Sequence, residues 1–144
     1  MTSVPAGIHP HYTLLCEDIR FEVSNRISLI GLFENVVTPQ LPVSMIKTTV
    51  LTYWHGQGSG MSEVRVLSPD RSRIIAASNP GLIDLTAGGA THNVVFFVNI
   101  VLPEQGTYWI QTVLDSQVVA ETPFVVVLAQ QSPAPVSTEA TFAN

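Results

Sequence analysis

The four histidines are the residues of this chain best suited to bind a metal ion. His9 and His11 are two residues apart, so they would share one face of a strand. His55 and His92 are distant from this pair and from each other in the sequence. A zinc site usually takes its ligands from two close pairs. We therefore expect exposed histidines at strand ends and loops, and no metal site.

The carboxylates and the cysteine also lack a catalytic pattern. Glu17 and Asp18 are adjacent, so on a strand they point to opposite faces and cannot act as a paired acid and base. Cys16 is the single cysteine, and its apolar neighbours are typical of a buried small hydrophobe. The sequence predicts no catalytic residue, no cofactor and no enzyme activity. It leaves calcium binding by end loops open, although the three loop carboxylates do not cluster in sequence: Asp70, Asp84 and Asp115.

Composition and charge exclude further classes of protein. The glycine-rich residues 56–60 lack the Lys-Ser/Thr of a phosphate-binding loop, and no helical pattern follows them. Charged residues make up 12% of the chain, the net charge is −5, and the six Lys and Arg residues form no patch. Binding to nucleic acid is therefore not expected.

The length and the two ends of the chain predict one domain with flanking segments. A chain of 144 residues forms one domain. Residues 1–10 contain no Lys or Arg and no apolar run, so we expect no signal peptide and a cytoplasmic location. No apolar run approaches the roughly 20 residues of a membrane helix, so no membrane partner is expected. We predict an N-terminal arm over 1–10, a folded domain over 11–128 and a Pro/Ser/Thr-rich tail over 129–144.

Short strand-like runs separated by turn signals occupy the predicted domain. Loops are expected at residues 56–60 and 79–90, where glycine and proline accumulate. This pattern predicts a single immunoglobulin-like antiparallel β-sandwich of about eight strands with little or no helix. The strands are expected at residues 11–23, 26–37, 45–55, 61–68, 72–78, 91–102, 107–115 and 117–128.

The last two runs can be paired in register as a hairpin. With a three-residue turn at 115–117, Tyr108 faces Phe124 across the pair. A two-residue turn would put Ile110 opposite Glu121 and mix core with charge. We therefore predict the three-residue turn, which is an ordinary hairpin class.

Tyr108 also fits a motif at the start of this hairpin. It follows Gly106 after a turn rich in polar residues. That arrangement resembles the tyrosine corner of immunoglobulin-like sandwiches, in which the hydroxyl bonds to the backbone a few residues upstream. The alternative is a tyrosine that simply packs at a strand end.

Two short segments carry a resemblance to a known family. Residues 16–20 read Cys-Glu-Asp-Ile-Arg, and residues 28–31 read Ser-Leu-Ile-Gly. Together they resemble the N-terminal signature of an uncharacterised bacterial family, a domain of unknown function thought to be a β-sandwich. That family usually has Cys-Asp-Asp-Ile-Arg, so Glu17 departs from its pattern. The resemblance extends to about Val127 and implies a β-sandwich with no assigned activity.

Residues 91–102 are apolar on both faces of the predicted strand. Alternation places one set in the core: Val94, Phe96, Val98, Ile100 and Leu102. The outer sheet face then has an apolar set too: Val95, Phe97, Val101, Trp109, Val113 and Val119. Exposed apolar patches of more than a few hundred Å² usually mark a partner site. We predict a non-catalytic structural or interaction module that assembles through this face, with a protein partner or with itself as a homo-oligomer.

A ligand-binding domain is the alternative. Tyr53 and Trp54 precede the flexible residues 56–60 and would supply a stacking surface beside an adaptable backbone. A sugar or a peptide would then bind in the loops at one end of the sandwich. The partner and the number of subunits cannot be read from the sequence.

Overall fold

The computed structural model describes residues 7–129, which form strands joined by short turns. Within this part the one helical element is the short turn η1 (Val23–Asn25), and no helix is long and apolar enough to cross a membrane. The prediction of an all-β fold is confirmed. The strands are β1 (Ile8–Cys16), β2 (Asp18–Phe21), β3 (Ile27–Ile30), β4 (Asn35–Thr38), β5 (Val43–Leu67), β6 (Ile74–Ala77), β7 (Gly81–Leu102), β8 (Gly106–Leu114) and β9 (Gln117–Leu128).

The predicted flanking segments lie largely outside the described residues. Residues 1–6 of the predicted arm and residues 130–144 of the predicted tail are beyond the described part of the chain. Residues 8–10, which the prediction assigned to the arm, belong to β1.

The long strands β5 and β7 pair antiparallel with each other and organise the molecule. Four glycines near the middle of this ribbon have positive φ, which residues with a Cβ rarely adopt: Gly56, Gly58, Gly88 and Gly89. The β5–β7 register shifts between Gly56 and Gly58, and the pairing then resumes. The predicted loops are therefore wrong at 56–60 and 81–90, because the glycines bend the strands instead of ending them, whereas Asn79 and Pro80 do connect β6 with β7.

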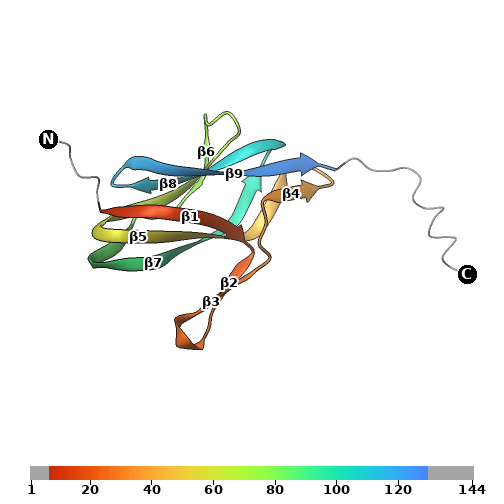
Figure 1. The fold of residues 1–144 in the computed structure, drawn as a ribbon. Helices are drawn as coiled ribbons and strands as arrows, with labels where there is room; N and C mark the ends of the chain where they lie inside the picture. The colour runs from red at the N-terminus through yellow and green to blue at the C-terminus, as the bar shows by residue number, and fades with distance from the viewer. Residues whose placement is uncertain (1–6, 130–144) are drawn as a thin grey trace, which may run out of the picture.

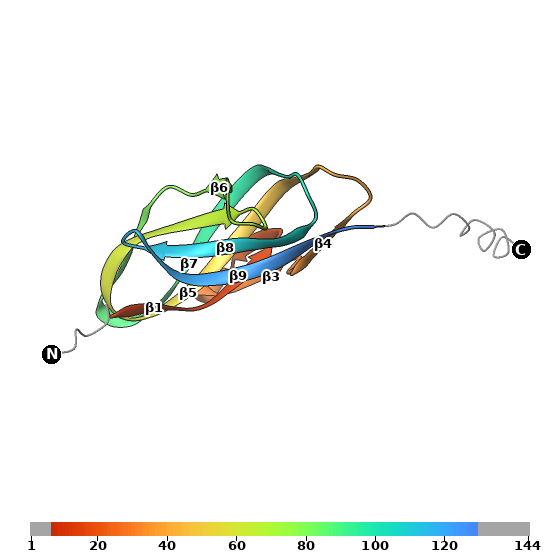
Figure 2. The ribbon, with the colours of Figure 1, turned by 90° about the horizontal axis from the view of Figure 1, so that it is seen from above.

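The bend places the two parts of β5 in different layers (Figure 1). The first part lies between β1 and β7, and the second part pairs with β8 on one side and with β6 on the other. From β8 the sheet continues through β9 to β4, and the β4–β9 pair is parallel. The result is one curled, mostly antiparallel sheet of seven strands, with β2 and β3 forming a separate hairpin. Figure 2 shows β8 and β9 lying across β5 and β7.

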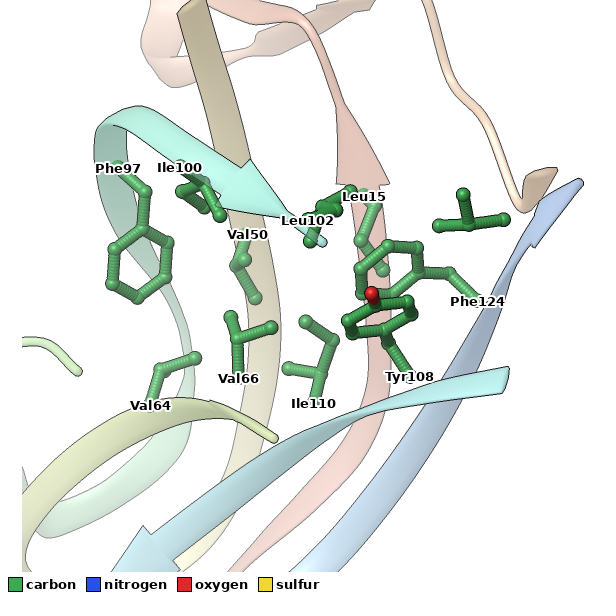
Figure 3. Close-up of a cluster of buried hydrophobic side chains, with 11 residues drawn as sticks. Leu15, Val50, Val64, Val66, Phe97, Ile100, Leu102, Tyr108, Ile110 and Phe124 are labelled. Atoms are coloured by element: carbon green, nitrogen blue, oxygen red, sulfur yellow. The ribbon is translucent and has the colours of Figure 1, made fainter. Parts of the chain in front are cut away.

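The main hydrophobic core fills the space between the two layers (Figure 3). Leu15 of β1 and Val50 of β5 enter it from one layer, and Ile110 of β8 and Phe124 of β9 enter it from the other. A second, smaller cluster surrounds Trp54 near the bend of the ribbon. The curled sheet thus buries apolar side chains from strands that are distant in sequence.

The alternation of faces reverses within β7 at Asn99. Asn99 has φ = 57°, and the ladder between β5 and β7 is interrupted where it meets Ile46. Asparagine tolerates this left-handed conformation better than most residues. As a result Phe97 and Ile100, three residues apart, both face the core. The predicted core positions Phe96 and Val98 are wrong, because both side chains are exposed.

The β8–β9 hairpin has the predicted register from the Thr112–Ala120 pair onward, but the turn and the two pairs next to it differ, since Leu114 lies opposite Gln117 and Val113 opposite Val118. Tyr108 lies opposite Phe124, as predicted. The turn has two residues, Asp115 and Ser116, and both have positive φ. Pairs of this kind suit the tight turns that match strand twist. The register shifts where Val119 forms a bulge, and this extra residue restores the pairing that a three-residue turn was expected to give.

The predicted tyrosine corner is present. The Tyr108 hydroxyl donates to the backbone oxygen of Glu104 at 2.6 Å and accepts from the Glu104 backbone N–H at 3.1 Å. Burial raises the pKa of Tyr108, which keeps the hydroxyl protonated as a donor. The corner fixes the connection from β7 into β8.

Tyr108→Phe should lower the free energy of unfolding by about 1–3 kcal/mol, because it leaves both backbone groups of Glu104 without this partner. Urea unfolding would measure the change. Tyr12→Phe is the matched control, since its exposed hydroxyl makes a single long contact of 3.4 Å with His92. Equal effects of the two substitutions would contradict a stabilising role for the corner.

Candidate functional site

The apolar outer face expected from the sequence does not form as one surface. Phe97 is 7% exposed and Val113 is fully buried, so the prediction that they face outward is wrong. Val95 is partly buried against the main core. The reversal of faces at Asn99 explains why Phe97 is buried and why its neighbours Phe96 and Val98 are exposed. Val101 and Val119 are exposed, but on different strands.

Trp109 is partly covered by a loop of the same chain. The Arg71 guanidinium lies over the Trp109 ring at 4.1 Å from its centroid. Arg71 also donates to Glu121 at 2.9 Å, and Gln111 donates to the same carboxylate at 2.8 Å. The hydrogen bond from Arg71 lowers the pKa of Glu121. This polar group of Arg71, Gln111 and Glu121 surrounds Trp109 and removes it from the expected apolar face.

The residues of the alternative ligand site are separated by the sheet. Trp54 is fully buried, so its ring cannot stack on a ligand as predicted. Tyr53 lies on the opposite side of β5 and is partly exposed. Its ring stacks on Tyr12 at 5.1 Å and packs on His92 at 4.9 Å between centroids. With neighbouring rings against it on both sides, Tyr53 does not offer an open platform for a sugar.

The candidate catalytic groups are occupied by local contacts. Cys16 is buried, and burial raises the pKa of its thiol, which disfavours the thiolate. Asp18 accepts a hydrogen bond from Lys47 at 2.7 Å, which lowers the pKa of that carboxyl. The hydroxyl and backbone N–H of Ser72 lower the pKa of Asp70 to about 2. Within residues 7–129 no group of three His, Cys, Asp or Glu side chains is arranged to hold a metal ion.

A groove runs between β6 and β7 on one side of the curled sheet. It has a volume of about 480 Å³. Its walls combine polar groups, among them Arg73 and Asn99, with apolar side chains of the two strands: Ile74, Ile75 and Ala76 from β6, and Phe97, Val98 and Ile100 from β7. We call this feature the β6–β7 groove.

The two strands that border the β6–β7 groove each have an unpaired edge. Within residues 7–129, β6 and β7 both pair with β5 and with no other strand. The apolar rim is open to solvent, with Val98 67% and Ile74 59% exposed. Sequence reasoning missed this surface because it put Val98 in the core. The signal that could have revealed it is Asn99, a residue prone to positive φ inside an apolar strand.

The histidines gather on the outer face of the layer made by β1, β5 and β7. The β1–β5 register sets His9 opposite His55, and the β5–β7 register sets Tyr53 opposite His92. His11 lies 5.3 Å from His55 between ring centroids. We call the set of His9, His11, Tyr12, Tyr53, His55 and His92 the histidine–tyrosine row. All four histidines are exposed, as expected, but they lie within strands and not in loops. Cross-strand pairing brings together residues that are far apart in sequence.

A second hollow lies beside one end of this row. It has a volume of about 500 Å³ and separates the tip of the β2–β3 hairpin from the start of the apolar part of β7. Phe21 and Arg26 line it on the hairpin side, and Thr91 and His92 line it on the β7 side. The sequence does not predict that these segments line one hollow, since the hairpin and β7 are remote in the chain.

Comparison with known proteins identifies a family and a similar fold. A profile described as "Family of unknown function (DUF6941)" matches residues 11–127. No curated protein matches the chain. A solved structure of the Pseudomonas fluorescens alkylpurine DNA glycosylase AlkC, bound to DNA containing an abasic site analogue, aligns at 6% identity with a TM-score of 0.50. The alignment covers 85% of this chain and 31% of the glycosylase chain, and it indicates similarity of fold alone.

Proposed function

The chain belongs to the family of unknown function DUF6941, and from its own geometry we propose a non-catalytic interaction module that holds an extended, apolar protein segment in the β6–β7 groove. The observation that carries this proposal is the pair of strand edges, unpaired within residues 7–129, on either side of a groove that is lined in part by apolar side chains.

Strand addition is the recognition mode that this arrangement favours. An extended peptide that joins a free sheet edge gains backbone hydrogen bonds, and its alternate side chains enter pockets beside the edge. Phe97 and Ile100 would form the apolar floor that receives these side chains, while Val98 and Ile74 would cover them from the rim. The ligand would therefore be read by its extended backbone and by apolar side chains at alternate positions.

The two edges are also protected against indiscriminate pairing. β6 has only four residues, and the ladder of β7 is interrupted at Asn99. Short or irregular edge strands limit association with unrelated strands. A specific partner would need to fit the groove as well as the edge, which supports selective recognition.

The proposal keeps the predicted interaction function but moves the surface. Val98 and Ile74 at the rim of the β6–β7 groove take the place of Phe97 and Val113 as the exposed apolar residues of the proposed surface. The low charged fraction of 12% is consistent with a surface that is partly covered by a partner. A second copy of the chain is the simplest partner, and sedimentation at rising protein concentration distinguishes a homo-oligomer from binding to another protein.

Val98→Lys should weaken the binding of extended apolar peptides at least about tenfold, or about 1.4 kcal/mol, because a charge would replace an apolar wall of the groove. Peptides selected from a displayed library against the wild-type protein would serve as ligands, and fluorescence anisotropy would give their affinities. Val119→Lys introduces the same charge at an exposed residue of β9 outside the groove and should leave binding unchanged.

Two outcomes of this experiment would count against strand addition in the groove. The library could yield no enriched peptide, or the selected peptides could bind both lysine variants equally well. In the second case the peptides recognise another surface. Circular dichroism of both variants ensures that a loss of binding does not reflect unfolding.

Two finer predictions from the sequence belong with this proposal. We propose that the curled sheet is an immunoglobulin-like sandwich, and the tyrosine corner at Tyr108 supports this classification. Binding of a sugar or peptide by end loops near Tyr53 and Trp54 is less well supported, because the Trp54 ring is buried and the Tyr53 ring is packed between neighbours.

A further inference from the structure

His55 lies at the centre of three imidazoles in the histidine–tyrosine row. Its ring centroid is 5.7 Å from that of His9 and 5.3 Å from that of His11. His9 is its direct partner in the β1–β5 ladder, and His11 lies where that ladder shifts register. All three side chains are exposed, so they are free to change rotamer.

These separations match two imidazoles bound to one metal ion. A ligating imidazole nitrogen lies about 2.0–2.1 Å from zinc, which puts the ring centroid about 3.2 Å from the metal. Two such rings at a tetrahedral angle would have centroids about 5.2 Å apart. The distances from His55 to His9 and His11 are close to this value, so small rotations of the rings can direct two nitrogens to one point without a change in the backbone.

We propose that His55 and His11 bind a divalent transition-metal ion on the outer face of β1 and β5. Imidazole suits copper, nickel and zinc, and affinity for a given nitrogen site rises to a maximum at Cu²⁺. Because no group of three His, Cys, Asp or Glu side chains within residues 7–129 could hold a metal ion, the protein supplies two imidazoles and water supplies the other ligands. The net charge of −5 favours the approach of a cation.

Isothermal titration of the whole chain with Cu²⁺, Ni²⁺ and Zn²⁺ tests the site. We expect one ion to bind per chain, with Cu²⁺ tightest, and no binding of Mg²⁺, which prefers oxygen ligands. His55→Gln should weaken Cu²⁺ binding at least about tenfold, since loss of a second-shell partner alone costs about 10–100-fold. His92→Gln is the matched control, because His92 packs on Tyr53 and makes no ring contact with His55.

The proposal is overturned if the wild-type protein binds none of the three ions at millimolar concentration. It is also overturned if His92→Gln weakens binding as much as His55→Gln, since binding would then reflect exposed histidines in general. His11→Gln provides an independent check on the same site and should weaken binding in the same way. Thermal unfolding without metal shows whether each variant keeps the wild-type fold, and the metal-dependent rise in Tm should disappear only in the site variants.

Discussion

Phe97→Ala should lower the free energy of unfolding by about 3–5 kcal/mol, whereas Phe96→Ala should lower it by about 1 kcal/mol or less. The Phe97 ring is part of the main core, and its removal leaves a cavity that the surrounding strands cannot fill. Phe96 is 47% exposed and contacts the Lys47 ammonium at 5.0 Å from the ring centroid. Urea unfolding with linear extrapolation measures both changes.

The comparison of these neighbours tests the reversal of faces at Asn99. Strict alternation through β7 places Phe96 inside and Phe97 outside, and it predicts the opposite order of stabilities. A larger loss for Phe96→Ala would therefore contradict the described packing. It would also restore the apolar outer face expected from the sequence.

Gly56→Ala should destabilise the protein by at least about 1–3 kcal/mol, the cost of holding a residue in a sparsely populated backbone region. Gly56 has φ = 126°, and a Cβ at this position would overlap the Gly7 carbonyl oxygen. The strain and the overlap both act at the bend of β5, where the chain passes between layers. Thermal unfolding should show the loss as a lower Tm.

Gly81→Ala is the matched control for this substitution. A Cβ at Gly81 would meet no atom within 4 Å, and Gly81 is absent from the positive-φ residues of the described chain. Replacing glycine at a compatible position stabilises a protein by about 0.4–1 kcal/mol through the unfolded state. If Gly56→Ala were as stable as Gly81→Ala, the bend would not depend on glycine.

Sequence reasoning succeeded where the signal is local. The register of Tyr108 against Phe124 follows from matching apolar faces across one short turn, and it is correct although the turn itself has two residues. The tyrosine corner joins Tyr108 to a residue only four positions earlier. Both features depend on neighbours along the chain, so the residues alone specify them.

Sequence reasoning failed where the position of a side chain depends on one backbone angle or on a strand that is remote in the chain. The positive φ of Asn99 exchanges the faces of β7. A prediction based on strict alternation of side chains along a strand cannot include such an exchange. The sequence suggested that the Trp54 ring is exposed, but this ring is fully buried between the layers. His9 and His55 meet through the β1–β5 register, which cannot be derived from either segment alone. Both the groove and the histidine–tyrosine row are therefore products of tertiary pairing.

The passage of β5 and β7 through both layers has a consequence for how the protein folds. Neither layer has a complete set of strands of its own, so neither can persist while the other is lost. Unfolding should therefore be a single cooperative event. Most of the pairing joins segments distant along the chain, such as β1 with β5 and β5 with β8, and such high contact order slows the search for the native state. Because β5 and β7 run through the whole sheet, the groove forms only when the whole sheet has folded.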